Sequence, residues 1–202
     1  MSSTSLFSQA AESFVQLVGQ IDPEQWDEPG LGSWTVRDLT GHTTRAILTV
    51  VNYLGQEESG DVTVPTAEHY YTVALTQFGD DASVATRGVE AGVWLGDNPL
   101  DRIRPALAEA RVLLGAQLPN RIVTIGGLGI PLAEYLRTRA FELTVHTLDL
   151  SRATGIAHDL SPVVLTAATT LAASTAVARG HGEEVLLALT GREPLPDGFS
   201  VV

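Results

Sequence analysis

Apolar residues recur at helical spacing along most of the chain, and this pattern predicts a mainly α-helical fold. In the first such segment, residues 4–19, an apolar residue returns every three or four positions, so these side chains share one helical face. Gly19 follows the last of them and is typical of a helix end. The apolar face consists of Leu6, Ala10, Phe14, Leu17 and Val18.

Later helices are marked by residues that favour helix starts and stops. Thr35 and Asp38 have the spacing of a capping box, so a helix is expected from there to Leu54, before Gly55. A third helix is expected at about 66–78, with a continuation to 95 if the Gly-Asp-Asp sequence at 79–81 does not end it. A fourth is expected at 99–118, where Pro105 is a candidate late start. A further helix is expected at 161–179.

Residues 121–131, RIVTIGGLGIP, depart from helical spacing. Their β-branched run and their glycines predict a short strand or an extended connection. Neither Gly nor Pro interrupts the following residues 132–154, and Gly155 is suited to the position after a helix end. Although residues around Leu143 alternate as in a strand, the length of the segment favours a helix. A strand remains the alternative.

The composition is that of a globular chain without a nucleic-acid-binding surface. Of 202 residues, 44% are hydrophobic and 18% are charged, which excludes a disordered chain. The formal net charge is −12, and no basic stripe is present to neutralise phosphates. Lys and Cys are both absent, which excludes Schiff-base chemistry and thiol nucleophiles on the protein itself. Any thiol chemistry would use a thiol from solution.

The apolar runs are too short to span a bilayer, and the first residues lack the basic and apolar regions of a signal peptide. We therefore expect a cytoplasmic protein with no membrane partner. A homodimer is left open, because an apolar bundle of this size can associate with a second copy.

Two polar residues in the apolar segment 132–154 are the first candidates for chemistry. Glu142 and His146 are four apart, so on a helix their β-carbons lie about 5–6 Å from each other on one face. Carboxylate and imidazole are both ligands of borderline cations such as Zn²⁺. His42, inside the capped helix, is the best candidate for a third ligand, since bundle helices bring distant residues together. A solvated pair and a structural histidine remain alternatives.

Further residues have two interpretations each. Asp38, one turn before His42, either orients that imidazole from a second shell or caps its helix. Asp149, three residues after His146, either orients that ring or faces solvent.

Trp34 is expected to pack as an apolar anchor. Arg45 is expected in a surface ion pair, with attraction of an anionic substrate as the alternative. Histidines outside these segments are interpreted as ordinary polar positions, with one exception: His69, together with Tyr70 and Tyr71, is a candidate lining of the same cavity.

Three sequence segments, taken together, carry a family resemblance. GSWTVRDLTGHTTRA, residues 32–46, contains a Trp-x-Val-Arg-Asp-Leu-x-x-His signature, and RTRAFELTVHTLDLSRATG, residues 137–155, contains Arg-x-x-Glu-x-x-x-His-x-x-Asp. LLALTGREPLP, residues 186–196, is similar to the closing motif of short family members. The motifs, in this order, resemble those of the mycothiol-dependent maleylpyruvate isomerase family within the DinB-like superfamily, and the resemblance covers most of the chain.

The resemblance implies a DinB-like up-down helical bundle with a short extended element before the metal-bearing helix. Residues 1–160 would form the metal-binding bundle, and residues 161–202 a C-terminal helix and tail packed on it. It also implies His42, Glu142 and His146 as ligands of a divalent metal, usually zinc, with mycothiol or a similar low-molecular-weight thiol as cosubstrate.

The function expected from the resemblance is that of a metal-dependent, thiol-using transferase or isomerase acting on a small electrophilic metabolite. A non-catalytic metal-binding or ligand-sensing bundle and a metal-dependent hydrolase are the alternatives. The well-known maleylpyruvate isomerases carry a further C-terminal domain that contributes to the active site, and the residues after Gly155 are too few for a full one. The substrate is therefore left open.

Overall fold

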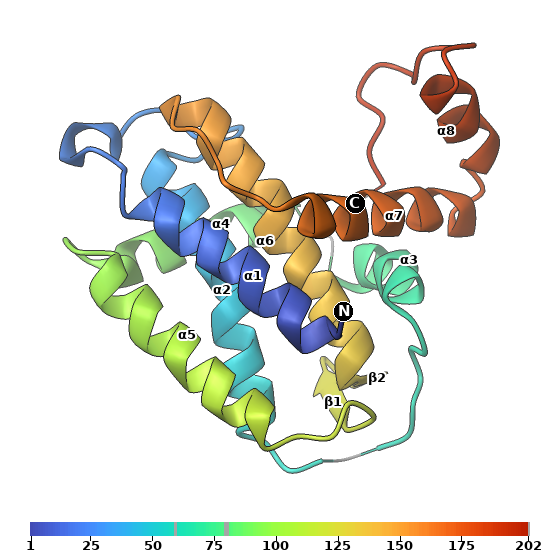
Figure 1. Cartoon of the computed structure of the whole chain (residues 1–202), viewed down its shortest axis with the longest axis horizontal. Coiled ribbons are helices and arrows are strands. Elements are labelled where there is room, and N and C mark those ends of the chain that lie inside the picture. Colours follow the sequence, from blue (N-terminus) through green and yellow to red (C-terminus); the bar gives the residue numbers. More distant parts are fainter. Residues whose placement is uncertain (59, 79–80, 202) are drawn as a thin grey trace.

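Helices dominate the computed structural model, which describes residues 1–58, 60–78 and 81–201 (Figure 1). The prediction of a mainly α-helical bundle with a short extended element is confirmed. The elements, in chain order, are α1 (Ser3–Val18), the short 3-10 helix η1 (Pro23–Gln25), α2 (Val36–Leu54), α3 (Ala67–Phe78), α4 (Asp81–Leu95), α5 (Leu100–Gly115), β1 (Ile122–Ile125), β2 (Leu128–Pro131), α6 (Leu132–Thr154), α7 (Pro162–Ala178) and α8 (Gly182–Leu189).

The two helices that carry the candidate ligands begin and end as the sequence predicts. The Thr35 hydroxyl accepts from the Asp38 backbone N–H at 3.2 Å, and the Asp38 carboxylate accepts from the Thr35 N–H at 3.1 Å, so the capping box of α2 is confirmed. Gly155 ends α6 at a φ of 73°, which residues with a side chain rarely adopt. Because α6 is a continuous helix, the strand alternative for this segment is wrong.

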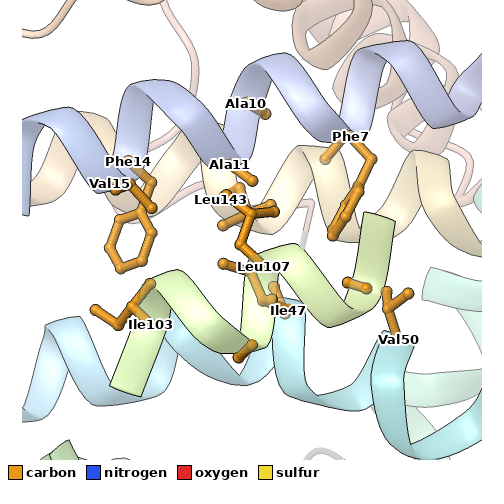
Figure 2. Packing of buried hydrophobic residues seen from close by; sticks show 14 of the residues in the cluster. Phe7, Ala10, Ala11, Phe14, Val15, Ile47, Val50, Ile103, Leu107 and Leu143 are labelled. Carbon is orange, nitrogen blue, oxygen red and sulfur yellow. The ribbon is translucent and has the colours of Figure 1, made fainter. Parts of the chain in front are cut away.

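Helices α1, α2, α5 and α6 bury their apolar faces against one another. Figure 2 shows side chains from all four helices in one cluster, among them Phe14, Ile47, Leu107 and Leu143. Phe14, Ile47 and Leu143 are fully buried, and each such side chain contributes about 1.5–3 kcal/mol to folding. This packing fixes α2 next to α6, and their facing positions carry the candidate ligands.

The extended segment before α6 is a two-stranded hairpin, one strand more than the sequence predicts. Strands β1 and β2 are antiparallel, with Val123 opposite Ile130, and Gly126 and Gly127 turn the chain at φ values of 54° and 87°. The second strand was missed because its sequence, LGIP, contains a glycine and a proline, which usually mark loops.

Helix α5 begins before Pro105, so the late start considered for this helix is wrong. The proline lies in the second turn on an exposed face, where the lost hydrogen bond leaves a backbone carbonyl within reach of water. Buried residues on the opposite face, at helical spacing, offset that cost: Ile103, Ala106, Leu107, Ala110 and Leu114.

Helices α3 and α4 flank the face where α2 meets α6. Helix α3 packs against α6 and α7, whereas α4 packs against α2. Positions 79 and 80, where the sequence indicates an interruption, lie outside the described residues. The two helices therefore supply neighbours to α2 and α6 from segments distant in the sequence.

The C-terminal helices extend from the bundle. Helix α7 packs against α3 and α6, and α8 contacts α7 and lies at the edge of the molecule, beyond the end of α7 (Figure 1). Leu186 and Leu189 of α8 are exposed. A domain boundary after residue 160 stays a prediction. None of the helices in the described part of the chain has the length and apolar character needed to cross a membrane.

Candidate metal centre

The facing surfaces of α2 and α6 bring His42, Glu142 and His146 together. One candidate ligand atom from each of these residues lies within 4.8 Å of the others. The imidazole rings of His42 and His146 meet edge to face, with their centroids 4.9 Å apart. The four-residue spacing on α6 and the separate helix α2 thus produce one convergent group, as expected from the sequence.

His146 is oriented by two carboxylates. Its Nδ1 lies 3.1 Å from Oδ2 of Asp149, and its Nε2 lies 3.4 Å from Oε2 of Glu142. Burial lowers the pKa of His146, but the hydrogen bonds to Asp149 and Glu142 outweigh it and raise the pKa to about 9. Because Asp149 holds Nδ1, Nε2 is the nitrogen that faces the convergent group.

Glu142 is held as a carboxylate by neighbours from two helices. The hydroxyl of Tyr71, a buried residue of α3, donates to Oε1 of Glu142 at 2.9 Å. Burial raises the pKa of Glu142, but the hydrogen bond from His146 and the nearby Arg139 charge lower it to about 2. The second oxygen, Oε2, points to His146 and is the one available to a shared ligand.

His42 has a different environment. Its Nδ1 is buried and has no hydrogen-bond partner among the described residues. Burial and the charge of His146 lower the pKa of His42 to about 4, so its imidazole is neutral at physiological pH. Its ring contacts the indole of Trp34, with the centroids 4.5 Å apart. A buried nitrogen without a partner is costly unless it binds another group, such as an ion or water.

These residues fit a divalent cation. Two imidazoles and one carboxylate are the ligand set of several catalytic zinc sites, which keep a fourth position open for water or substrate. A carboxylate hydrogen-bonded to the far nitrogen of the ring, as Asp149 is to His146, usually supports a metal-binding histidine. An imidazole binds a metal ion in its neutral form, so His146 would lose its proton on binding, and Glu142 would supply the negative charge that a cation requires.

The two aspartates considered as supports for the histidines have different partners. Asp149 contacts His146, as described above. The Asp38 carboxylate instead accepts hydrogen bonds from the Thr35 hydroxyl, at 2.8 Å, and from the Thr35 N–H. Of the two roles considered for Asp38, the structure therefore shows the helix cap.

The aromatic residues of α3 are divided between the site and the surface. His69 is exposed, whereas Tyr71 reaches Glu142. Tyr70 contacts Arg139, whose Cζ lies 5.7 Å from its ring centroid. Tyr70 and Tyr71 were candidates for the cavity, whereas Arg139, the Arg of the Arg-x-x-Glu motif, was given no role, although its position three residues before Glu142 places it on the same face of α6.

Arg45, beside the site, is not paired as expected. Arg45, one turn after His42, is half-buried, and among the described residues no carboxylate lies within ion-pair distance of it. The surface ion pair expected for Arg45 is therefore not observed. Burial and the nearby Arg87 charge lower its pKa, with a smaller contribution from Arg139. The chain thus concentrates positive charge next to His42, despite its acidic composition.

The fold and the site define a class of protein: a helical bundle with a candidate two-histidine, one-glutamate metal centre between two of its helices. Comparison with family models identifies the family. Residues 7–151 match the mycothiol maleylpyruvate isomerase N-terminal domain, and the chain belongs to this family, as its motifs indicate. The matched region includes all three candidate ligands. No curated protein and no solved structure matches the chain.

Proposed function

We propose that this protein is a metal-dependent enzyme that uses a low-molecular-weight thiol, with mycothiol as the first candidate, to transfer or isomerise a small electrophile. His42, Glu142 and His146 would hold one divalent cation, with zinc as the first candidate. The observation that carries the proposal is the convergence of these three ligand atoms within 4.8 Å. The family match supports the thiol.

A cation bound by three protein ligands supplies an open coordination position and holds an incoming thiol as thiolate at neutral pH. The chain itself has no Cys, so the nucleophile comes from solution and the protein binds it without competition from its own thiols. Asp149 fixes the His146 ring, and Tyr71 fixes the Glu142 carboxylate. These contacts preorganise the ligands, so little reorganisation accompanies binding.

The arginines beside the site favour an electrophile with an anionic group. Arg45 follows His42 by one turn, and Arg139 precedes Glu142 by one turn, so both guanidinium groups flank the ligands. Arg139 lies against the ring of Tyr135, with its Cζ 5.1 Å from the centroid, and donates through Nε to Thr138 at 3.0 Å. A carboxylate on the substrate would find hydrogen-bond donors here, and charge attraction would position its electrophilic carbon near the thiol.

The test is thiol consumption by the zinc-loaded protein. Mycothiol is incubated with a panel of electrophiles, with and without a carboxylate, and both loss of free thiol and product mass are measured. We expect turnover that disappears with chelator, with His42→Ala and with Glu142→Gln. His69→Ala, which removes an exposed histidine away from the site, is the matched control and should retain the activity.

Two results would contradict the proposal. Zinc binding without any thiol-dependent turnover across the panel would leave a non-catalytic metal-binding bundle. Hydrolysis of a substrate in the absence of thiol, abolished by the same variants, would assign the nucleophile to water.

A further inference from the structure

The two histidines of the site are supported in different ways. The ring of His146 is oriented by a hydrogen bond from Nδ1 to Asp149. His42 has no hydrogen bond to a carboxylate among the described residues, and its ring contacts are with His146 and with the indole of Trp34, tilted by 32°. Metal-binding imidazoles usually depend on a second group that fixes their orientation. For His42, packing against Trp34 is the contact available for that role.

Trp34 is itself firmly held before the start of α2. Its backbone N–H donates to the Leu31 carbonyl at 2.9 Å, and its own carbonyl accepts from the Gly30 N–H at 2.8 Å. Its indole Nε1 donates to the backbone carbonyl of Ala85 in α4 at 3.1 Å. The ring is therefore fixed from both ends, by the turn that carries it and by a helix distant in the sequence.

Glycines of α4 allow this close approach. A β-carbon at Gly88 would lie 2.6 Å from Cε2 of Trp34, which is too close for any residue but glycine unless the ring moves. One turn later, a β-carbon at Gly92 would lie 2.7 Å from Oδ1 of Asp38. On the facing helix, a β-carbon at Gly41, the residue before His42, would lie 2.2 Å from the Gly92 backbone nitrogen. The backbones of α2 and α4 thus meet next to His42.

We propose that Trp34 is the positioning residue of His42: its indole, held on the glycine-lined surface of α4, fixes the imidazole in the orientation that metal binding requires. The inference rests on the proposed metal site but makes a separate claim about how one of its ligands is held. It also gives the glycine spacing Gly88-x-x-x-Gly92 a role, because these glycines let α4 support both the indole and the start of α2.

The first test uses the metal-free protein. An imidazole stacked on an indole ring has its proton resonances shifted upfield by the ring current. We expect this shift for His42 in the wild type and its loss in Trp34→Leu. Trp26→Leu is the matched control, because Trp26 is a buried tryptophan that contacts Arg37, and it should retain the shift. Unchanged His42 resonances in folded Trp34→Leu would overturn the proposal, whether or not the protein binds zinc.

The second test measures the dissociation constant for zinc and the visible spectrum of the cobalt(II) protein. Trp34→Leu should weaken zinc binding about 10- to 100-fold and alter the cobalt spectrum, as loss of an outer-shell partner does. Trp34→Phe, which keeps an aromatic ring, should restore most of the affinity, and Trp26→Leu should match the wild type. Equal losses in Trp34→Leu and Trp26→Leu would assign the effect to general destabilisation and overturn the proposal.

Gly88→Ala provides the same test should Trp34→Leu not fold. The added methyl group would displace the indole while leaving it in the protein. We expect weaker zinc binding and an altered cobalt spectrum, and wild-type values for both would overturn the proposal. If the wild type itself binds no zinc, the proposed function fails, and the resonance test still decides the role of Trp34.

Discussion

Replacement of Asp149 by Asn isolates the electrostatic support of one candidate ligand. The side chain of Asp149 is 18% exposed, and its Oδ2 lies 3.1 Å from Nδ1 of His146. Asn keeps the size and can still accept a hydrogen bond, so the fold should be unaffected while the negative charge is lost. Carboxylates that hydrogen-bond to a metal-binding histidine typically contribute about 10- to 100-fold to metal affinity, which corresponds to about 1.4–2.7 kcal/mol. We expect Asp149→Asn to weaken zinc binding by that factor.

The assay is competition for zinc with a chromophoric chelator of known affinity. Asp159→Asn, at an exposed position, makes the same change in charge away from the site and should leave the affinity unchanged. Wild-type affinity in Asp149→Asn, alongside loss of binding in His146→Ala, would refute the reasoning, because the ligand would then need no carboxylate behind it. Equal weakening in Asp159→Asn would show a long-range effect of net charge instead.

Three further predictions concern stability and protons. Tyr71→Phe removes the hydrogen bond to Glu142 and should lower the unfolding free energy of the metal-free protein by about 1.5–3 kcal/mol in urea titration; an unchanged midpoint would contradict this. Gly41→Ala forces a methyl group into the backbone of α4 and should lower the melting temperature. Gly115→Ala, where a β-carbon would meet nothing within 4 Å, should not lower it. Equal melting temperatures in the two variants would refute the close approach of α2 and α4. Burial lowers the pKa of His146, yet hydrogen bonds raise it to about 9, so the ring is protonated at pH 7.5. Zinc binding at that pH should therefore release about one proton per ion, which calorimetry in buffers of different ionisation enthalpy measures. The absence of proton release would contradict the protonated state.

Local signals in the sequence were sufficient for the helices that carry the site. The capping box of Thr35 and Asp38 and the left-handed glycine at 155 depend on neighbouring residues alone, and both are observed. Local signals were less reliable where glycine and proline occur inside elements. Pro105 within α5 and the strand from Leu128 to Pro131 are stabilised by tertiary packing, which propensity does not include.

The sequence alone supports some of the candidate ligands more directly than others. Glu142 and His146 follow from helical spacing. His42 depends on the packing of α2 against α6, so the sequence offered it only as the best candidate for a third ligand, which the family resemblance then supported. The surroundings were harder to predict, because they come from other segments. Tyr71 reaches Glu142 from α3, and Trp34 is fixed by α4. Both contacts join segments distant in the sequence, so no residue spacing within one segment predicts them.

The central claim is that His42, Glu142 and His146 bind one divalent cation, and metal stoichiometry tests it most directly. The wild type and the variants are stripped with chelator, incubated with zinc, freed of unbound ion and analysed for metal content. We predict one zinc ion per chain in the wild type and in His69→Ala, and markedly less in His42→Ala and in Glu142→Gln. A wild type that retains no zinc, or a His42→Ala variant that binds as much as the wild type, would contradict the account.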